Sequence, residues 1–317
     1  MEKPITIELE QIKPNTKIFN KYLLTTIFQT LFYWPTYFIL KLIFGLNIEG
    51  QDNLKSIKNQ PIIFAANHCH WLDGTIGGHS LPRKIFAPFE FMPLHFIVAK
   101  EFFNLRNSFP FPLSILVALY VRINGSLPIE KNQSKSLEEK LKNVIELLYQ
   151  RHKIWIFPEG KRSKDGKLQK GKRGLGYLHK RTGAPIVPVA LINTFQCTNP
   201  KNLLQFILRR KRIKVIFGKP ITRLENLEIE EIVNRVMNEI AWLLKVGNSV
   251  QTTENFKIIF EKNNILVKTL RYVLIPILNN IPSGLIKSIL KKTTKDSTNI
   301  LEKPATSHAL ETLYTFH

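Results

Sequence analysis

Short apolar runs bounded by polar residues recur along the middle of this chain. Runs of this length, bounded by Gly, Pro, Asn or charged residues, are typical of buried strands. They are Ile62–Ala66, Phe96–Ala99, Leu116–Val121, Ile154–Phe157, Ile186–Ala190 and Ile213–Phe217. Two other segments, Ser136–Gln150 and Glu228–Lys245, have apolar residues at helical spacing, and Ser136 with Glu139 forms a capping box. The alternation predicts an α/β fold with a mostly parallel central sheet flanked by helices.

An uncharged stretch precedes the first strand. Residues Leu23–Leu40 carry no charge over 18 positions, which is the lower limit for a membrane-spanning helix, and Pro35 lies among them. Tyr33, Trp34 and Tyr37 are of the kind found at the headgroup level of a bilayer. We therefore expect residues 1–48 to be an N-terminal membrane-associating helical segment, in which 22–46 contact the lipid. A buried core helix with a proline kink is the alternative.

The pattern changes again near Gly247. Apolar clusters punctuated by lysines continue to residue 292, and the last residues are polar. We expect an α/β domain over 49–246, followed by a basic helical extension and polar tail over 247–317. A basic amphipathic segment can lie on a membrane, and a small helical appendix packed on the main domain is the alternative.

The charge of the chain indicates an anionic partner. Among 317 residues, 46 are Lys or Arg and 24 are Asp or Glu, which gives a net charge of +22. Together with the 44% of hydrophobic residues, this charge favours an anionic membrane surface and phosphorylated substrates. No recognisable RNA-binding module is present, so a nucleic-acid partner is not expected. Two cysteines are too few for a disulfide framework.

The first candidate site follows the strand 62–66. His68 and Asp73 are five residues apart and would not share one face of a helix. They can meet only where a strand-end loop turns into the start of a helix. There a carboxylate can hold one imidazole nitrogen while the other faces a substrate hydroxyl. Because no Gly-x-Ser-x-Gly elbow exists, a dyad of this kind suits direct attack by a substrate alcohol.

A metal site is the competing interpretation of the same stretch. His68, His70, Asp73 and His79 are all possible ligands of zinc. Their spacing matches no His-Glu-x-x-His or comparable template. We therefore expect no metal, and a metal-dependent hydrolase remains the enzymatic alternative.

A second candidate site follows the strand 154–157, in the sequence Phe-Pro-Glu-Gly-Lys-Arg-Ser over 157–163. Ligands of an open α/β sheet bind beyond the carboxyl ends of its strands, so this cluster and the first can share one site. Many cations follow it. The stretch 166–172 resembles a phosphate-binding P-loop, but Arg173 stands where Ser or Thr would bind magnesium, which argues against an NTPase. Arg122, after the run 116–121, is a further candidate phosphate contact.

Four blocks in this order resemble one family. They are Asn-His-x-x-x-x-Asp over 67–73, the run ending in Arg122, Phe-Pro-Glu-Gly-x-Arg-Ser over 157–163, and Ala-Pro-Ile-Val-Pro-Val over 184–189. The set is similar to the glycerolipid acyltransferases, the lysophosphatidate (1-acylglycerol-3-phosphate) acyltransferase family, over about residues 50–225. Lys161 departs from the pattern, because the family usually has a small residue there.

The resemblance implies an O-acyltransferase of phospholipid biosynthesis that needs no cofactor. His68 would be the general base on the hydroxyl of a lysophospholipid or glycerol phosphate, and Asp73 would orient His68. The acyl donor would be acyl-CoA or acyl-carrier-protein. The acceptor-binding residues would be Arg122, Glu159, Gly160, Arg162 and Ser163. The enzyme would be membrane-associated, with its active site on the cytoplasmic side. A non-catalytic basic lipid-binding protein, which would not need the dyad, is the other alternative.

Overall fold

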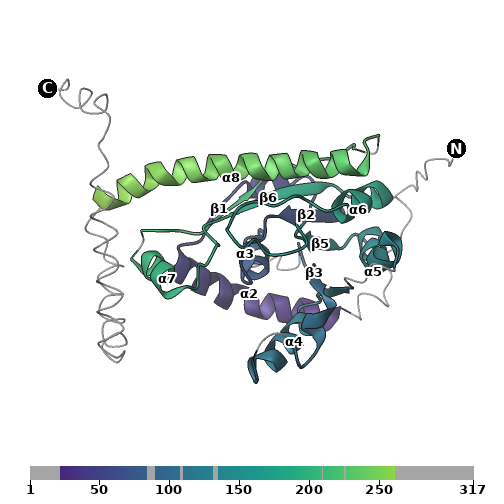
Figure 1. Cartoon of the computed structure of the whole chain (residues 1–317), viewed down its shortest axis with the longest axis horizontal. Coiled ribbons are helices and arrows are strands. Elements are labelled where there is room, and N and C mark those ends of the chain that lie inside the picture. The colour runs from purple at the N-terminus through teal and green to yellow at the C-terminus, as the bar shows by residue number, and fades with distance from the viewer. Residues whose placement is uncertain are drawn as a thin grey trace. The chain divides into compact units, whose positions relative to one another are not determined.

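A mostly parallel sheet lies at the centre of the computed structural model (Figure 1). The structure describes residues 22–83, 90–107, 110–130, 135–208, 210–224 and 226–260, with side chains as far as residue 248. The strands are β1 (Asn47–Glu49), β2 (Ile62–Ala66), β3 (Leu94–Ala99), β4 (Leu127–Ile129), β5 (Lys153–Ile156), β6 (Ile186–Ile192) and β7 (Lys214–Phe217). Five of the six predicted strands are confirmed.

The order of the strands is β1-β7-β6-β2-β5-β3-β4. The pairing of β6 with β7 is antiparallel, and the other neighbours in this order run parallel. As a result, β2, β3, β5 and β6 end at one edge of the sheet. Both predicted candidate clusters follow strands of this group, β2 and β5.

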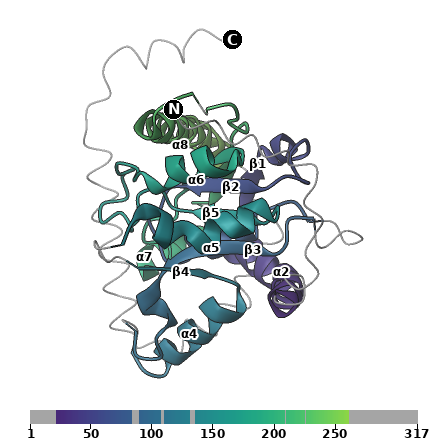
Figure 2. The same cartoon turned by 90° about the vertical axis from the view of Figure 1, so that its right-hand side faces the viewer.

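Helices cover both faces of the sheet (Figure 2). They are α2 (Leu23–Phe44), α3 (Asp73–Gly78), α4 (Leu113–Ile123), α5 (Leu137–Tyr149), α6 (Gly174–Thr182), α7 (Pro200–Ile207) and α8 (Ile229–Phe260). Side chains of β2 alternate between two buried clusters: Phe64 packs with α2, α3 and α7, and Ile63 packs with α5, α6 and α8. The expected α/β fold with helices on the sheet is confirmed.

The predicted strand Leu116–Val121 is wrong, because this run lies in helix α4. Ser114, Ala118 and Val121 are the buried residues of α4, at the spacing of one helical face. A short, continuous apolar run has no alternation that separates a strand from a helix. Arg122 therefore lies in the last turn of a helix and does not follow a strand.

The predicted helix Ser136–Gln150 is confirmed as α5. The Ser136 side chain accepts from the Glu139 backbone N–H, and the Glu139 carboxylate accepts from the Ser136 N–H, as a capping box requires. The second predicted helix is the first half of α8, which continues through residue 246 to Phe260. Residues 261–317, which hold most of the predicted basic extension and tail, lie outside the described residues.

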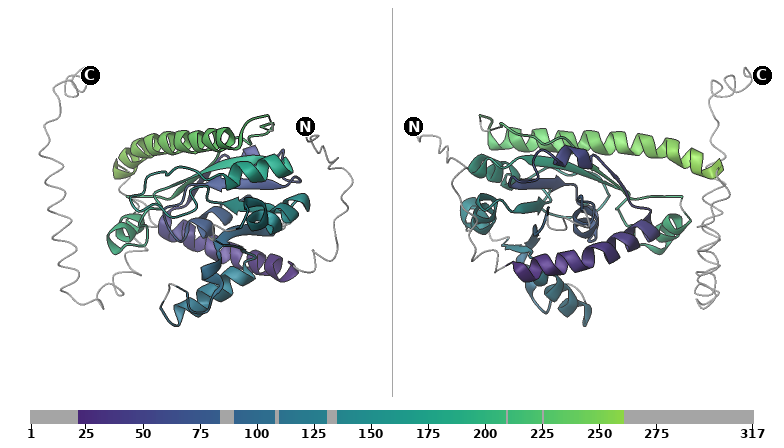
Figure 3. Two further views of the ribbon diagram at one scale, coloured as in Figure 1. Left: turned by 45° about the vertical axis from the view of Figure 1, so that its right-hand side comes forward. Right: turned by 180° about the vertical axis from the view of Figure 1, so that it is seen from behind.

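Helix α2 is both a core element and an exposed apolar surface. It runs without interruption through Pro35 and crosses one face of the sheet (Figure 3). Tyr33, Leu40 and Phe44 are buried in the core. The buried Gln29 amide donates to the carbonyls of Leu94 and Asn124 and accepts from the Leu94 N–H, which ties the helix to β3. The same helix exposes Leu24, Leu31, Phe32, Phe38 and Ile39 among others.

Only one described helix, α2, is long and apolar enough to cross a membrane, and length and composition are the whole basis of that finding.

Candidate active site

The loop after β2 brings His68 and Asp73 together, as the predicted strand-to-helix turn requires. Helix α3 begins at Asp73, and His68 Nδ1 lies 2.9 Å from Asp73 Oδ2. The Asp73 side chain is fully buried, whereas the His68 side chain is 19% exposed. The carboxylate is therefore enclosed by protein and the imidazole reaches the surface.

The Asp73 carboxylate organises the whole loop. Its Oδ2 also accepts the backbone N–H groups of Cys69, at 2.6 Å, and His70, at 2.7 Å. Three donors on one oxygen identify this group as an acceptor, so the proton between Asp73 and His68 belongs to His68 Nδ1. In the neutral form of the ring, Nε2 then carries the lone pair, and this atom has no hydrogen-bond partner among the residues that the structure describes.

The ring of Phe157 supports the His68 imidazole. Phe157 directly follows β5, and its ring stacks on that of His68 with 3.9 Å between centroids and 11° between planes. An aromatic face attracts a cation, so this contact becomes more favourable when the imidazole gains a proton. The predicted cluster 157–163 gave Phe157 no role, because an apolar residue at the end of a strand looks like any other core residue.

Glu159 fixes the backbone of the loop after β2 that carries His68. One of its carboxylate oxygens accepts the His68 N–H at 2.8 Å, and the other accepts the Gln169 N–H at 3.1 Å. The side chain is 1% exposed, and burial raises the pKa of Glu159 while the two backbone amides oppose that rise. Both oxygens are thus occupied by the protein's own backbone.

The other residues of the second cluster lie around the Glu159 carboxylate. The Ser163 N–H donates to the His68 carbonyl at 2.7 Å, and its buried hydroxyl donates to Asp165. Gly160 has φ +68°, where a side chain would be strained and would meet Lys172 at 2.8 Å. Arg162 is exposed, and its charge adds to the burial that lowers the pKa of His70. The structure therefore joins the clusters after β2 and β5 in one site.

Arg122 lies near the end of β3. Its Nη2 donates to the carbonyl of Phe103, at 2.6 Å, in the 3₁₀ helix Lys100–Phe103 that begins directly after β3. Because β3 pairs with β5 in parallel, this segment follows the same edge of the sheet as the second cluster. Lys100 lies at the same strand end, where its ammonium is paired with Glu130.

The described residues do not contain the set of ligands that the alternative of a metal site requires. Among the described residues, no group of three or more His, Cys, Asp and Glu side chains is arranged to hold a metal ion. His70 Nδ1 accepts the Leu72 N–H and His70 Nε2 meets the Thr198 hydroxyl, so both ring nitrogens are used. His79 donates to the Thr75 carbonyl and stacks on Tyr33. Neither histidine faces Asp73 with a free nitrogen.

The nearby thiols are not nucleophiles at neutral pH. Cys69 and Cys197 lie beside the dyad, and burial together with the Asp73 charge raises the pKa of each thiol to about 12. A protein-bound acyl intermediate on either sulfur is therefore disfavoured. The arrangement can instead remove a proton from an alcohol placed at His68 Nε2.

Comparisons with known proteins show which family this chain resembles. The family described as Acyltransferase matches residues 45–192. The chloroplastic 1-acyl-sn-glycerol-3-phosphate acyltransferase LPAT1 of Arabidopsis thaliana is 28% identical over 56% of this chain and 44% of that protein. The 1-acyl-sn-glycerol-3-phosphate acyltransferase of Saccharomyces cerevisiae is 27% identical over 66% of this chain and 63% of that protein. The chain thus spans between about half and two thirds of the length of these relatives.

A solved structure is also similar to this chain. The crystal structure of the 1-acyl-sn-glycerophosphate (LPA) acyltransferase PlsC from Thermotoga maritima matches with a TM-score of 0.49 and 19% identity, over 74% of this chain and 84% of that one. The family match includes the whole first cluster, the Phe-Pro-Glu-Gly cluster and β6. Residues 45–192 thus match the acyltransferase family, and the resemblance to the glycerolipid acyltransferases that the four blocks indicated is confirmed.

Proposed function

We propose that this protein transfers a fatty acyl group from a thioester donor to the free hydroxyl of 1-acylglycerol 3-phosphate. The observation that carries the proposal is the His68–Asp73 pair at the carboxyl edge of the sheet, with His68 Nε2 available to a ligand. The family match over residues 45–192 and the names of the relatives supply the reaction class and the acceptor.

In this mechanism His68 acts as the general base. Its Nε2 accepts the proton of the acceptor hydroxyl while the oxygen attacks the thioester carbon. The C–S bond then breaks, and the thiol carrier leaves with a proton returned from His68. Asp73 holds Nδ1 and stabilises the imidazolium that forms, and the Phe157 ring beneath the imidazole assists in the same direction.

Cations near the dyad would bind the phosphate of the acceptor. Arg162, which follows β5, and Arg122, which contacts the segment after β3, flank the same edge of the sheet. Arginine presents a fork that matches phosphate oxygens, so we assign these two side chains to the headgroup. Glu159, Gly160 and Ser163 shape the wall through the backbone contacts described above.

The membrane contact that we propose is an exposed apolar surface on α2 and α4. On α4 and the turn before it, Phe111 is 80% and Leu116 is 60% exposed, and the rings of Phe28 on α2 and Tyr120 on α4 lie 6.2 Å apart. The two helices lie side by side in Figures 1 and 2. This surface would bring the site to its lipid substrate on the cytoplasmic side of the membrane.

Identification of the product lipid tests this function. The full-length protein is incubated with labelled acyl-CoA or acyl-carrier-protein and, in parallel, with 1-acylglycerol 3-phosphate, glycerol 3-phosphate and a lysophosphatidylcholine. We expect labelled phosphatidate from the first acceptor and insensitivity to a metal chelator. Label that appears only as free fatty acid, or only in the presence of a divalent metal, would contradict an acyltransferase and favour a hydrolase.

A further inference from the structure

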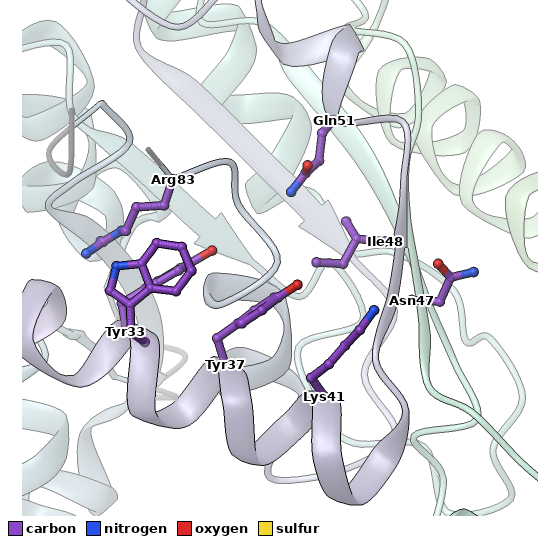
Figure 4. Close-up of a pocket in the computed structure, with 8 residues that line it drawn as sticks. Tyr33, Tyr37, Lys41, Asn47, Ile48, Gln51 and Arg83 are labelled. Carbon is purple, nitrogen blue, oxygen red and sulfur yellow. The ribbon is translucent and has the colours of Figure 1, made fainter. Parts of the chain in front are cut away.

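A pocket of about 270 Å³ lies beside α2, formed by residues outside the four sequence blocks. Its lining comes from α2, from β1 with the 3₁₀ helix after it, and from the segment after α3. The lining residues are Tyr33, Trp34, Tyr37, Lys41, Asn47, Ile48, Gln51 and Arg83, and Figure 4 shows Tyr37, Lys41, Ile48 and Gln51 around one space. The volume is slightly below the range of sites that enclose whole drug-sized ligands, so it suits the headgroup of a larger molecule.

The chemistry of the lining favours an anion. Arg83 and Lys41 contribute two positive charges, and no Asp or Glu is among the lining residues. The Gln51 amide already donates to the Ser80 carbonyl and the Asn47 amide to Glu49, so the second N–H of each amide and the Tyr37 hydroxyl are the additional donors. The nearby Glu49 accepts from the Asn47 amide at 3.5 Å, and its charge is paired with the buried ammonium of Lys214 at 2.9 Å.

Arg83 is the residue with unused binding capacity. Its guanidinium carbon lies 4.3 Å from the centroid of the Tyr33 ring, and its Nη1 makes a 3.4 Å contact with the Gln29 carbonyl. Its Nη2 is buried and has no hydrogen-bond partner among the described residues. Burial disfavours the charged form and lowers the pKa of Arg83 to about 10. A partly buried cation without a carboxylate is costly, and a bound anion removes that cost.

The surroundings distinguish a lipid from a soluble anion. The Trp34 and Tyr37 rings contact the ring of Phe38, with centroids 6.1 Å and 5.9 Å away. Phe38 is 62% exposed and belongs to the apolar surface of α2. The pocket is thus continuous with a surface on which acyl chains can lie. We propose that this pocket binds the phosphate-bearing headgroup of an anionic membrane lipid, at a site separate from the acyl acceptor site.

The fluorescence of Trp34 reports on the pocket directly. Full-length protein is titrated with short-chain phosphatidate below its micelle concentration, short-chain phosphatidylcholine, glycerol 3-phosphate and inorganic phosphate. Trp34→Phe, which removes the reporter, identifies the part of the signal that comes from the pocket. We expect saturable change with phosphatidate, weaker binding of the two soluble phosphates, and little response to phosphatidylcholine.

Substitutions test whether the Trp34 fluorescence change depends on Arg83. Arg83→Gln should weaken phosphatidate binding by about ten-fold or more, because a hydrogen bond to a charged group contributes about 1.5–3 kcal/mol. Arg83→Lys should recover part of the loss. Arg235→Gln removes the same charge from the exposed face of α8 and should leave the affinity unchanged. Arg162→Gln should also leave the Trp34 signal unchanged, which separates this pocket from the acceptor site.

Three results would overturn the proposal. Equal affinity of Arg83→Gln and the unchanged protein for phosphatidate would remove the headgroup contact. Equal affinity for phosphatidate and inorganic phosphate would mean a free-phosphate site with no lipid contribution. Loss of the signal in Arg162→Gln would place the ligand in the acceptor site. If near-ultraviolet circular dichroism shows that Arg83→Gln is misfolded, Lys41→Gln at an exposed position gives the same test.

Discussion

The Asp73 carboxylate has more backbone partners than a simple orienting residue needs. One oxygen accepts from His68, Cys69 and His70, and the other has no partner among the described residues. Removal of this group therefore releases the loop as well as the imidazole. For that reason a loss of activity in an Asp73 variant can come from the position of His68 or from the fold of the loop. A His68 variant tests the chemistry more directly.

Cys69 separates direct attack from a covalent mechanism. We expect Cys69→Ser to keep acyl transfer within a few-fold of the unchanged protein, because the thiol is protonated at neutral pH and the proposed mechanism uses the substrate hydroxyl as the nucleophile. Steady-state rates with a labelled acyl donor measure this. A loss of a hundred-fold or more in a folded Cys69→Ser protein would favour an acyl-cysteine intermediate.

Arg162 tests the phosphate contact. Arg162→Gln should raise the KM for 1-acylglycerol 3-phosphate and leave the KM for the acyl donor nearly unchanged, since an exposed arginine fork is lost and the thioester does not meet it. Lys164→Gln, two residues away and also exposed, is the matched control. Equal increases in both constants for Arg162→Gln would assign this residue to the general shape of the site.

The histidine pair next to α2 gives the fold a predictable sensitivity to acid. His95 Nδ1 donates to the Gly125 carbonyl, so His95 Nε2 accepts from His152 Nδ1 at 2.9 Å. Burial, the His95 ring and the Lys153 charge lower the pKa of His152 to about 3. The unfolded chain, with a histidine pKa of about 6.5, binds this proton first, so stability is lost as the pH falls from about 6.5 toward 3.

Urea unfolding at pH 7 and pH 5 measures that loss. The His152 contribution should reduce the free energy of unfolding by up to about 2 kcal/mol between these values. His152→Asn keeps a donor for His95 without a titrating group, and it should show a correspondingly smaller decrease. The same decrease in both proteins would mean that the pair stays neutral in the unfolded chain or is charged in the fold.

At the scale of elements, five strands and the amphipathic helices α5 and α8 were predicted, whereas the apolar helix α4 was taken for a strand. The strands β2, β5 and β6 are buried on both faces, so each reads as a continuous apolar run. The run 113–123 is equally apolar, but it buries only one face of α4 and exposes the other. Exposure of this kind cannot be seen in the sequence, because it reflects what lies beside the helix.

The same ambiguity affects α2, which is in part the buried core helix of the alternative interpretation, while its membrane contact stays a prediction. Its Gln29 clamp and buried Tyr33, Leu40 and Phe44 make it part of the core, while its other side is apolar and exposed. Deletion of this segment would therefore damage the fold, and point substitutions are the proper test of membrane contact. Burial of apolar surface stabilises by about 25 cal/mol per Å² with little dependence on salt.

Leu31→Gln with Phe38→Gln on α2, and Leu116→Gln on α4, replace exposed side chains only. We expect each change to weaken flotation with anionic liposomes while the thermal unfolding temperature stays close to that of the unchanged protein. Trp242→Gln on α8 is the control, since Trp242 is 56% exposed on the opposite face of the sheet. Unchanged flotation of the α2 and α4 variants would place the membrane contact elsewhere in the chain.

At the scale of the whole molecule, the predicted site was assembled by the sheet. The sequence placed two polar clusters after two apolar runs, and the parallel pairing of β2 with β5 brings them to one edge. Three contacts could not be predicted: the hydrogen bond from the His68 N–H to Glu159, the stacking of Phe157 on His68, and the hydrogen bond between His70 and Thr198. Each joins residues whose spacing in the sequence carries no signal. Arg122 was singled out for a wrong reason, and it lies beside the 3₁₀ helix that follows the same edge.

The net charge of +22 would add an electrostatic contribution to the proposed membrane binding. Basic residues near an anionic surface contribute about 1 kcal/mol each, and salt screens them. Liposome binding should therefore weaken with added salt and retain a residual component from the apolar surface of α2 and α4. That residual component should be absent in the combined Leu31, Phe38 and Leu116 variant, whose binding should vanish at high salt.

The rate of acyl transfer by His68→Ala tests the central claim most directly. The purified variant is compared with the unchanged protein, using labelled acyl donor and 1-acylglycerol 3-phosphate, after circular dichroism has shown that both are folded. Loss of a positioned general base should lower the rate by about 10²–10⁴-fold. A folded His68→Ala protein that forms phosphatidate at a near-normal rate would contradict the His68–Asp73 mechanism.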